Sequence, residues 1–278
     1  MDFKYFSQNG NILPIEQAVI PLSNIEYGYG FGVYENIRVS NGNIYFLEDH
    51  TERLLESAKV IGITHPFDDK FIKNNIYELI KDHQKETFNL KILLIGGARK
   101  EKSTLNILCL NPLFPDRKLY RDGAEFITYN YERSFPHAKT LNMLESYLAY
   151  RKAKEVGAYD ALLINRGGLI TEGTRTNFFC IKDRTIYSPF EKDILLGVMR
   201  KAVLKVAGEN NFKIVETNIK LEDIRSYDGA FVTSTSSKIM PIKSINGQVI
   251  DYSETLKELT KLLNDFLDRC EGKMERAI

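Results

Sequence analysis

The chain has 278 residues, of which 43% are hydrophobic and 27% charged. This length and composition are typical of a globular protein with two cores, not of a disordered or fibrous chain. The 38 basic and 37 acidic side chains nearly cancel, so no overall charge attracts nucleic acid or an anionic membrane. Any anion that the protein binds must therefore be held by a local site.

The cysteines and histidines argue against metal or disulfide chemistry. Cys109, Cys180 and Cys270 are odd in number and widely spaced, which supports neither a disulfide framework nor a zinc site and fits a reducing cytoplasm. The four histidines lack the i, i+4 spacing of a ligand pair, so we expect no metal. The N-terminus does not resemble an export signal, and no apolar stretch approaches the ~18 residues that span a bilayer. We expect a cytoplasmic protein with no nucleic-acid or membrane partner.

The first part of the chain predicts strands mixed with two helices. Alternating strand formers over 33–40, an Asn-Gly pair and a second short strand predict a hairpin. Helical spacing predicts helices over about 48–61, ending at Gly62, and over 71–80. Strands are predicted over 90–95 and 105–110. The glycines at 28, 30 and 32 predict a backbone that passes close to a ligand.

A polar stretch with two prolines, residues 111–118, interrupts this pattern where neither a helix nor a central strand is expected. We place the domain boundary there. The predicted organisation is a small N-terminal α/β domain over 1–111, a linker over 112–123 and a C-terminal domain over 124–278.

The pattern of the second part of the chain predicts where Lys139 and Glu172 lie relative to helices and strands. Predicted in chain order are a strand over 124–129, a helix over about 142–156, strands over 159–164 and 169–172, and a surface helix over 256–267. Lys139 then lies in an irregular segment just before a helix. Glu172 lies at the end of a strand, beside Thr174 and Arg175.

Arg53, Lys139 and Glu172 are the three residue types that pyridoxal phosphate requires. The lysine can form a Schiff base with the aldehyde, the carboxylate can pair with the pyridinium nitrogen, and the arginine can hold the phosphate. Each residue also has an ordinary interpretation. Lys139 could be a surface lysine, Glu172 a solvated strand-end residue, and Arg53 an exposed helix arginine that pairs with Asp49 or Glu56.

The surroundings of these residues resemble one family over most of the chain. The resemblance is densest in six segments, which occur in the family's order: residues 27–38, 50–58, 138–142, 157–177, 195–200 and 231–237. The family is that of the class IV aminotransferases, also called fold-type IV pyridoxal-phosphate enzymes. It includes D-amino-acid and branched-chain aminotransferases and aminodeoxychorismate lyase.

The resemblance implies a two-domain α+β fold, with a small N-terminal α/β domain and a larger C-terminal domain built on a mixed, β-barrel-like sheet with helices. It implies that Lys139 is the catalytic residue, joined to pyridoxal 5'-phosphate as a Schiff base and able to shuttle a proton at the substrate Cα. It also implies a homodimer. The cofactor-binding residues that it implies are Arg53, Lys139, Glu172, Asn177, Val198, Met199 and Thr235.

Departures from the family's patterns bear on the choice between members. Glu35 is typical of the transaminases, because the lyase has threonine there. Leu144 and the segment 234–237 resemble D-amino-acid enzymes more than branched-chain enzymes. The arginine that binds the substrate carboxylate is displaced from its expected position, so several residues remain open. The candidate substrate-binding residues are Tyr34, Arg38, Arg99, Arg175 and Ser236.

These features predict a transaminase that moves an amino group from an amino acid to a 2-oxo acid such as 2-oxoglutarate. D-alanine is the first expected donor. The alternatives are a branched-chain L-amino-acid aminotransferase, then aminodeoxychorismate lyase, and, in another class, a non-catalytic paralogue that keeps the fold. The presence of Lys139, Glu172 and Arg53 speaks against the last of these.

Overall fold

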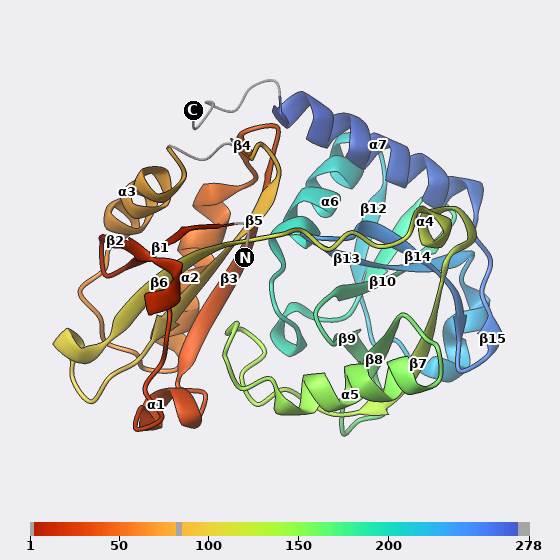
Figure 1. Ribbon diagram of the computed structural model, residues 1–278. Coiled ribbons are helices and arrows are strands. Elements are labelled where there is room, and N and C mark those ends of the chain that lie inside the picture. The colour runs from red at the N-terminus through yellow and green to blue at the C-terminus, as the bar shows by residue number, and fades with distance from the viewer. Residues whose placement is uncertain (1–2, 82–84, 272–278) are drawn as a thin grey trace. The chain divides into compact units, whose positions relative to one another are not determined.

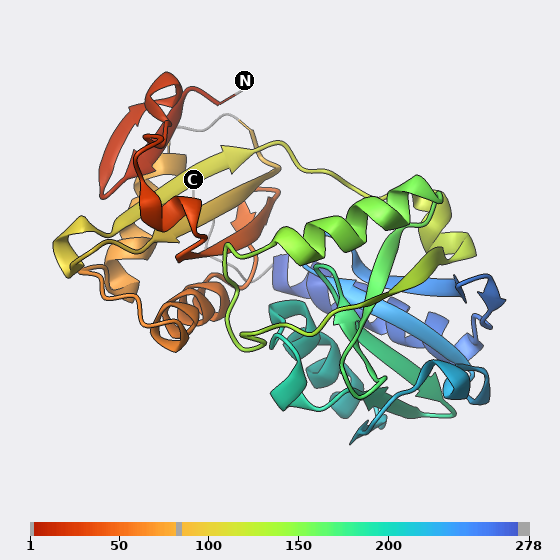
Figure 2. The ribbon, with the colours of Figure 1, turned by 90° about the horizontal axis from the view of Figure 1, so that it is seen from below.

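A computed structural model of the chain describes residues 3–81 and 85–271 (Figures 1 and 2). The chain divides into two compact units. The first contains the residues up to Leu113 together with His137–Met143, and the second contains Phe114–Pro136 and Leu144–Arg269. In the part of the chain that is described, no helix is both long and apolar enough to cross a bilayer.

The first unit is built on an antiparallel six-stranded sheet with strand order β2-β1-β6-β5-β3-β4. Its strands are β1 Tyr5–Gln8, β2 Asn11–Pro14, β3 Gly32–Ser40, β4 Asn43–Ile44, β5 Phe88–Ile95 and β6 Thr104–Leu110. Its helices are η1 Ile15–Gln17, α1 Ile25–Gly28, α2 Leu47–Val60, α3 Asp69–Ile80 and η2 Lys100–Lys102.

Local signals explain the elements around β3. Asn41 and Gly42 both have positive φ, 51° and 76°, as a two-residue hairpin turn requires, and the predicted hairpin of β3 and β4 is confirmed. The predicted helix end at Gly62 is also confirmed, since its φ of 75° lies in the left-handed region that ends helices. The side chain of Asp68 accepts a hydrogen bond from the Phe71 amide and caps α3, which starts two residues earlier than predicted.

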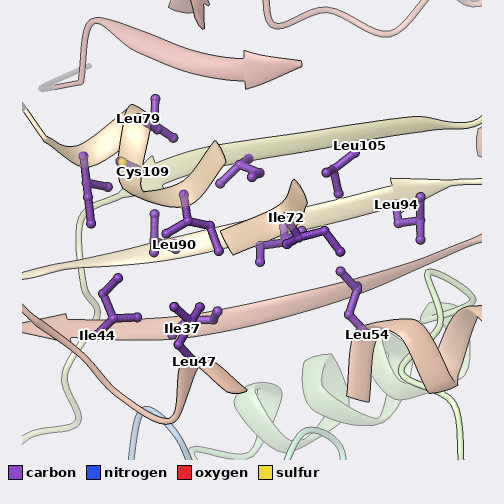
Figure 3. Packing of buried hydrophobic residues seen from close by; sticks show 14 of the residues in the cluster. Ile37, Ile44, Leu47, Leu54, Ile72, Leu79, Leu90, Leu94, Leu105 and Cys109 are labelled. Carbon is purple, nitrogen blue, oxygen red and sulfur yellow. The ribbon is translucent and has the colours of Figure 1, made fainter. Parts of the chain in front are cut away.

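One hydrophobic core joins α2 and α3 to the sheet (Figure 3). Side chains of a strand alternate between its two faces, and Val33, Ile37 and Val39 of β3 all lie in this core. Leu54 of α2 and Ile72 of α3 meet them there. Glu35 has the same parity as these residues, so β3 carries a carboxylate on its core-facing side.

The segment that contains Lys139 runs along the edge of β3. The Tyr34 amide donates to the Lys139 carbonyl oxygen over 2.9 Å, and the Leu141 amide donates to the Gly32 carbonyl oxygen over 2.8 Å. The Lys139 amide donates to Ser57 Oγ of α2 over 3.1 Å. Residues 137–143 therefore group with the first unit, although the predicted C-terminal domain, 124–278, included them. The proposed linker at 112–123 itself stays a prediction.

Two of the three glycines at 28, 30 and 32 leave room for the lysine segment to pack closely. A Cβ at Gly32 would lie 2.6 Å from Leu141 Cδ1, and Gly30, with φ of 72°, would place a Cβ 3.2 Å from the Asn142 amide nitrogen. A Cβ added at Gly28 would meet nothing within 4 Å. Among the described residues, the atoms that come close to Gly30 and Gly32 belong to the chain's own segment 141–142, at the place where the sequence predicted a ligand.

The second unit contains a nine-stranded mixed sheet. Its strands are β7 Ala124–Asn130, β8 Asp160–Ile164, β9 Ile170–Gly173, β10 Asn177–Lys182, β11 Thr185–Ser188, β12 Lys213–Glu216, β13 Gly229–Ser234, β14 Lys238–Ile245 and β15 Gln248–Val249. Its helices are α4 Arg117–Asp122, α5 Leu144–Glu155, η3 Glu191–Asp193, α6 Val198–Glu209, η4 Leu221–Ser226 and α7 Glu254–Glu271.

This sheet closes on itself. The order β10-β13-β14-β7-β8-β9 returns to β10 through the pairing of Glu172 with Asn177. β7 pairs in parallel with both β14 and β8, while the other pairs of the ring are antiparallel. The predicted mixed, barrel-like sheet is confirmed.

The proline-rich stretch 111–118 differs from its prediction at its end. Helix α4 begins at Arg117, two residues after Pro115. The side chain of Asp116 accepts a hydrogen bond from the Lys118 amide over 2.8 Å and caps the helix. The prolines therefore exclude a helix only up to Pro115.

Replacing Gly32 with alanine tests the packing of the lysine segment. The new methyl group would overlap Leu141 and approach the Leu94 carbonyl oxygen at 3.0 Å. We expect Gly32→Ala to lower the free energy of unfolding by roughly 1–3 kcal/mol in urea titrations. Gly28→Ala is the matched control, because open space surrounds that position, and it should change stability little. Equal stability of the two variants would contradict the close packing of residues 139–141 on β3.

Candidate active site

Glu35 is the centre of a buried charge cluster in the first unit. Its carboxylate accepts hydrogen bonds from Arg53 Nε and one Arg53 Nη, each 2.7 Å long. The Nδ1 atom of His50 lies 2.7 Å from Glu35 Oε2. Glu35 and His50 are fully buried, and the Arg53 side chain is 13% exposed. Arg53 is thus not the exposed helix arginine of the ordinary interpretation, because it forms a buried ion pair with a carboxylate of β3.

The electrostatics of the cluster favour an ionised Glu35 and a neutral His50. Burial by itself raises the pKa of Glu35, but the charge of Arg53, together with the hydrogen bonds from His50 and Arg53, outweighs it and lowers the pKa to about 2. Burial lowers the pKa of His50 more than the neighbouring carboxylate raises it. With His50 neutral, Nδ1 donates to Glu35. Its Nε2 atom is buried without a hydrogen-bond partner among the described residues.

Lys139 is half-buried, and its amine lies on the ring of Tyr34. The Nζ atom is 4.6 Å from the ring centroid, a distance at which a cation is attracted to the ring face. The Tyr34 hydroxyl is 3.8 Å from the sulfur of Met143, so the ring is held from two sides by the lysine segment. The lysine is not a freely solvated surface residue.

Glu172 is buried at the end of β9 and pairs with Arg133. The Arg133 Nε atom donates to Glu172 Oε1, and an Arg133 Nη donates to the Thr174 carbonyl oxygen over 2.9 Å. Glu172 Oε2 accepts a hydrogen bond from the Leu195 amide over 3.3 Å. The alternative of a solvated strand-end carboxylate is therefore excluded for Glu172, which is 2% exposed.

The turn before α6 lies beside Glu172. Asn177 donates from Nδ2 to the Leu195 carbonyl oxygen over 2.6 Å, and a Cβ at Gly197 would collide with Asn177 Oδ1. Gly197 is the N-cap of α6 and makes no side-chain cap. The amides of Val198 and Met199 therefore open the helix without a capping side chain, in the geometry that suits an anion.

The residues of the second unit suit a ring with an anionic substituent. The buried Glu172 carboxylate accepts from the Leu195 amide in the turn before α6, and the hydroxyls of Thr176 and Thr233 are buried without a hydrogen-bond partner within the described residues. Thr235 is partly buried in the turn after β13. Each unit by itself therefore contains groups that fit pyridoxal phosphate in their chemistry: the amine of Lys139 and the guanidinium of Arg53 in the first, the carboxylate and hydroxyls in the second.

The candidate substrate residues lie in different surroundings. Arg38 is half-buried on β3, with its guanidinium 5.9 Å from the Tyr45 ring centre. Arg99 is exposed in the loop after β5, and Ser236 is exposed in the turn before β14. Arg175 is exposed and stacks on Tyr150 of α5 at 4.6 Å. Their roles toward a substrate stay predictions.

Comparison with known proteins identifies the class of protein. Residues 32–245 match the sequence model of the family described as "Amino-transferase class IV". A D-alanine aminotransferase of Bacillus licheniformis is 32% identical over 251 residues, which cover 87% of this chain and 88% of that protein. A putative branched-chain-amino-acid aminotransferase of Methanocaldococcus jannaschii is 29% identical and covers 92% of this chain and 93% of its own length.

Solved structures share the fold. A branched-chain amino acid aminotransferase of T.th., crystallised with pyridoxamine 5'-phosphate, superposes with a TM-score of 0.90 at 22% identity and covers 99% of both chains. A branched-chain aminotransferase of Thermoproteus uzoniensis, crystallised with norvaline, has a TM-score of 0.88 at 23% identity and covers 97% of this chain and 96% of its own. The chain belongs to the class IV aminotransferases. The resemblance found in the sequence is confirmed.

Three groups in these surroundings were not recognised from the sequence as site residues. Glu35 served only to distinguish family members, although a carboxylate at the parity of Val33 and Ile37 in an apolar strand is itself a signal of a buried ion pair. His50 was considered only as a metal ligand. Arg133 lies in a polar stretch without periodicity, and no local signal connects it to Glu172.

Acid titration tests the charge cluster. Glu35 has its ordinary pKa of 4.5 in the unfolded chain and about 2 in the folded one. Its contribution to stability is complete above pH 4.5 and is lost as the pH falls toward 2, an effect on the order of 3 kcal/mol. We expect Glu35→Gln to be less stable than the wild type at pH 6 and to lose less stability between pH 4.5 and 2.

Urea titrations at a series of pH values measure this difference. Glu52→Gln is the control, because it removes the same charge from an exposed position next to Arg53. If the free energy of unfolding falls by the same amount between pH 4.5 and 2 in Glu35→Gln and in Glu52→Gln, Glu35 is not ion-paired as described.

Proposed function

We propose that the protein is a pyridoxal-phosphate-dependent transaminase that moves an amino group from an amino acid to a 2-oxo acid. Membership of the class IV aminotransferases supports the reaction. The donor set of Lys139, Glu172 and Arg53 supports the cofactor. The observation that carries most weight is the position of Lys139, a half-buried residue whose backbone is fixed on β3 and whose amine lies over the Tyr34 ring.

In this proposal Lys139 has two tasks. Its amine would hold the cofactor through the aldehyde carbon, with loss of water, and the same nitrogen, once released and neutral, would accept and return the proton at the substrate Cα. When bound, the cofactor supplies an electron sink for the charge that develops at that carbon. The hydrogen bonds of residues 139–141 with β3 keep the amine within one small region, which limits the entropy lost on reaction.

The other residues hold charge. The buried Glu172 carboxylate would accept a hydrogen bond from the ring nitrogen and favour its protonated form. Arg53 would donate to the phosphate through its guanidinium. The amides of Val198 and Met199 and the hydroxyl of Thr235 are the donors that the second unit would offer to the same group. Asn177 acts through the turn of Leu195, which it holds against β10.

D-alanine is the donor that we propose first. The D-alanine aminotransferases of Bacillus licheniformis and of Listeria monocytogenes, at 32% and 27% identity, support it. So do Leu144, where branched-chain enzymes have tyrosine, and the segment 234–237. Arg38, Arg99 or Arg175 would bind the donor carboxylate, with Tyr34 and Ser236 beside the substrate.

A branched-chain L-amino-acid donor is supported equally by the comparisons. Relatives from Methanocaldococcus jannaschii and several Rickettsia species are named as branched-chain aminotransferases, at 26–29% identity.

Homodimer formation stays a prediction. It is supported by exposed apolar side chains in residues 19–29, where Leu22, Ile25 and Tyr29 are largely uncovered in the single chain.

Reductive trapping tests the role of Lys139. Wild-type protein with pyridoxal phosphate should show a visible absorption band, and borohydride should fix the cofactor on the peptide that contains Lys139, as mass spectrometry measures. Lys139→Ala should lose both signals, because it removes the amine whose backbone is anchored on β3. Lys152→Ala, which removes an exposed lysine of α5, should keep both. Label on another lysine, or a colourless wild type, would refute this role.

A panel of donors tests the substrate. We expect D-alanine with 2-oxoglutarate to react at least about tenfold faster than L-leucine or L-valine, since a site that orients the amine and carboxylate for a D-amino acid holds the Cα–H bond of an L-amino acid in the wrong direction for proton transfer. D-glutamate with pyruvate, the reverse of the same reaction, should also be active. Faster reaction of L-leucine would establish the branched-chain alternative. Pyruvate release from aminodeoxychorismate without amino transfer would indicate the lyase. A protein that neither binds the cofactor nor turns over any donor would be the non-catalytic paralogue.

A further inference from the structure

Glu35 lies where a strand normally carries an apolar side chain. It is on the core-facing side of β3, between Val33 and Ile37, and it is fully buried. An unpaired carboxylate in such a place would cost several kcal/mol or lose its charge. Its pairing with Arg53 and His50 of α2 avoids that cost. An apolar residue would suit the packing of the core alone, so the buried ion pair as a whole calls for an explanation beyond packing.

The geometry of the pair restricts Arg53. Glu35 accepts from Nε and from one Nη, so its two oxygens engage one edge of the planar guanidinium through two hydrogen bonds of 2.7 Å each. Two parallel hydrogen bonds define both the position and the plane of the group. His50 in turn holds Glu35 Oε2 through Nδ1 over 2.7 Å. The carboxylate is therefore itself fixed from a second direction.

The net charge of the cluster shows what the pair offers to an anion. Glu35 and Arg53 cancel each other, and His50 is neutral because burial lowers its pKa. A phosphate that approaches Arg53 meets N–H donors of known direction but little net positive charge. Orientation is then the main contribution of the cluster, and it comes without the entropy cost of ordering a long side chain.

We propose that Glu35 is a positioning residue that fixes the guanidinium of Arg53 in the orientation that binds the phosphate group of the cofactor. This inference rests on the proposed function, in which Arg53 binds that phosphate. Glu35 touches no reacting atom and acts only through Arg53. Its effect should therefore depend on the presence of the phosphate and on the presence of Arg53.

Binding of two cofactor forms measures this effect directly. Pyridoxal 5'-phosphate and pyridoxal differ only in the phosphate group. The ratio of the dissociation constant of pyridoxal to that of pyridoxal 5'-phosphate therefore measures how much the protein gains from the phosphate. Glu35→Asp keeps the charge, but its side chain is one methylene shorter and loses the two-point contact. We expect this variant to reduce the ratio about tenfold, the loss of roughly one charge-assisted hydrogen bond, with pyridoxal binding nearly unchanged.

Two further variants separate positioning from charge and from general stability. In an Arg53→Ala background, Glu35→Asp should leave the ratio unchanged. Glu52→Gln, the exposed control, should also leave it unchanged. If Glu35→Asp does not fold, Arg53→Lys takes its place: it keeps a cation without a planar fork and should likewise reduce the ratio, whereas a retained ratio would overturn the proposal.

The outcomes separate failure of this inference from failure of the proposed function. A wild type that binds both forms equally would overturn the phosphate role of Arg53 and with it both proposals. A wild type that prefers the phosphorylated form, with an unchanged ratio in Glu35→Asp, would overturn only the positioning role. The positioning role would also be overturned if the ratio rose in Glu35→Gln while Glu35→Asp kept the wild-type value, because Glu35 would then act through its charge.

Discussion

The hydrogen bonding of residues 139–141 to the edge of β3 is the constraint on which the lysine's position depends. The carbonyl of Lys139 accepts from Tyr34, and Leu141 donates to Gly32, so the amine starts from a fixed backbone. Consecutive residues of β3 then serve opposite faces. Tyr34 supports the lysine amine on one face, and Glu35 holds Arg53 on the other.

Both units contain a buried carboxylate paired with an arginine. Glu35 pairs with Arg53 from a helix, and Glu172 pairs with Arg133 from a loop. Removing one member of such a pair leaves a buried charge uncompensated, at a cost of about 3–5 kcal/mol, so each pair ties a site residue to the stability of its own unit. Glu172 also meets the Leu195 amide, which joins its carboxylate to the turn that opens α6.

Local signals predicted much of the fold. The Asn41-Gly42 turn and the end of α2 near Gly62 both depend on residues that are neighbours in sequence. The capped helix after Asp116 could have been predicted in the same way. The grouping of residues 137–143 with the first unit could not, because it depends on hydrogen bonds between segments far apart in the chain.

The sequence by itself determined the family, several of the helices and strands, and the identity of the amine, carboxylate and guanidinium, because motifs and periodicity are local properties of the chain. Only the tertiary structure decided which partners these groups have. Arg133 meets Glu172 and Glu35 meets Arg53 because the folding of each unit brings loops and helices onto strand residues. The physical reason is that a buried charge must find a partner in space, and spacing along the sequence does not specify which one.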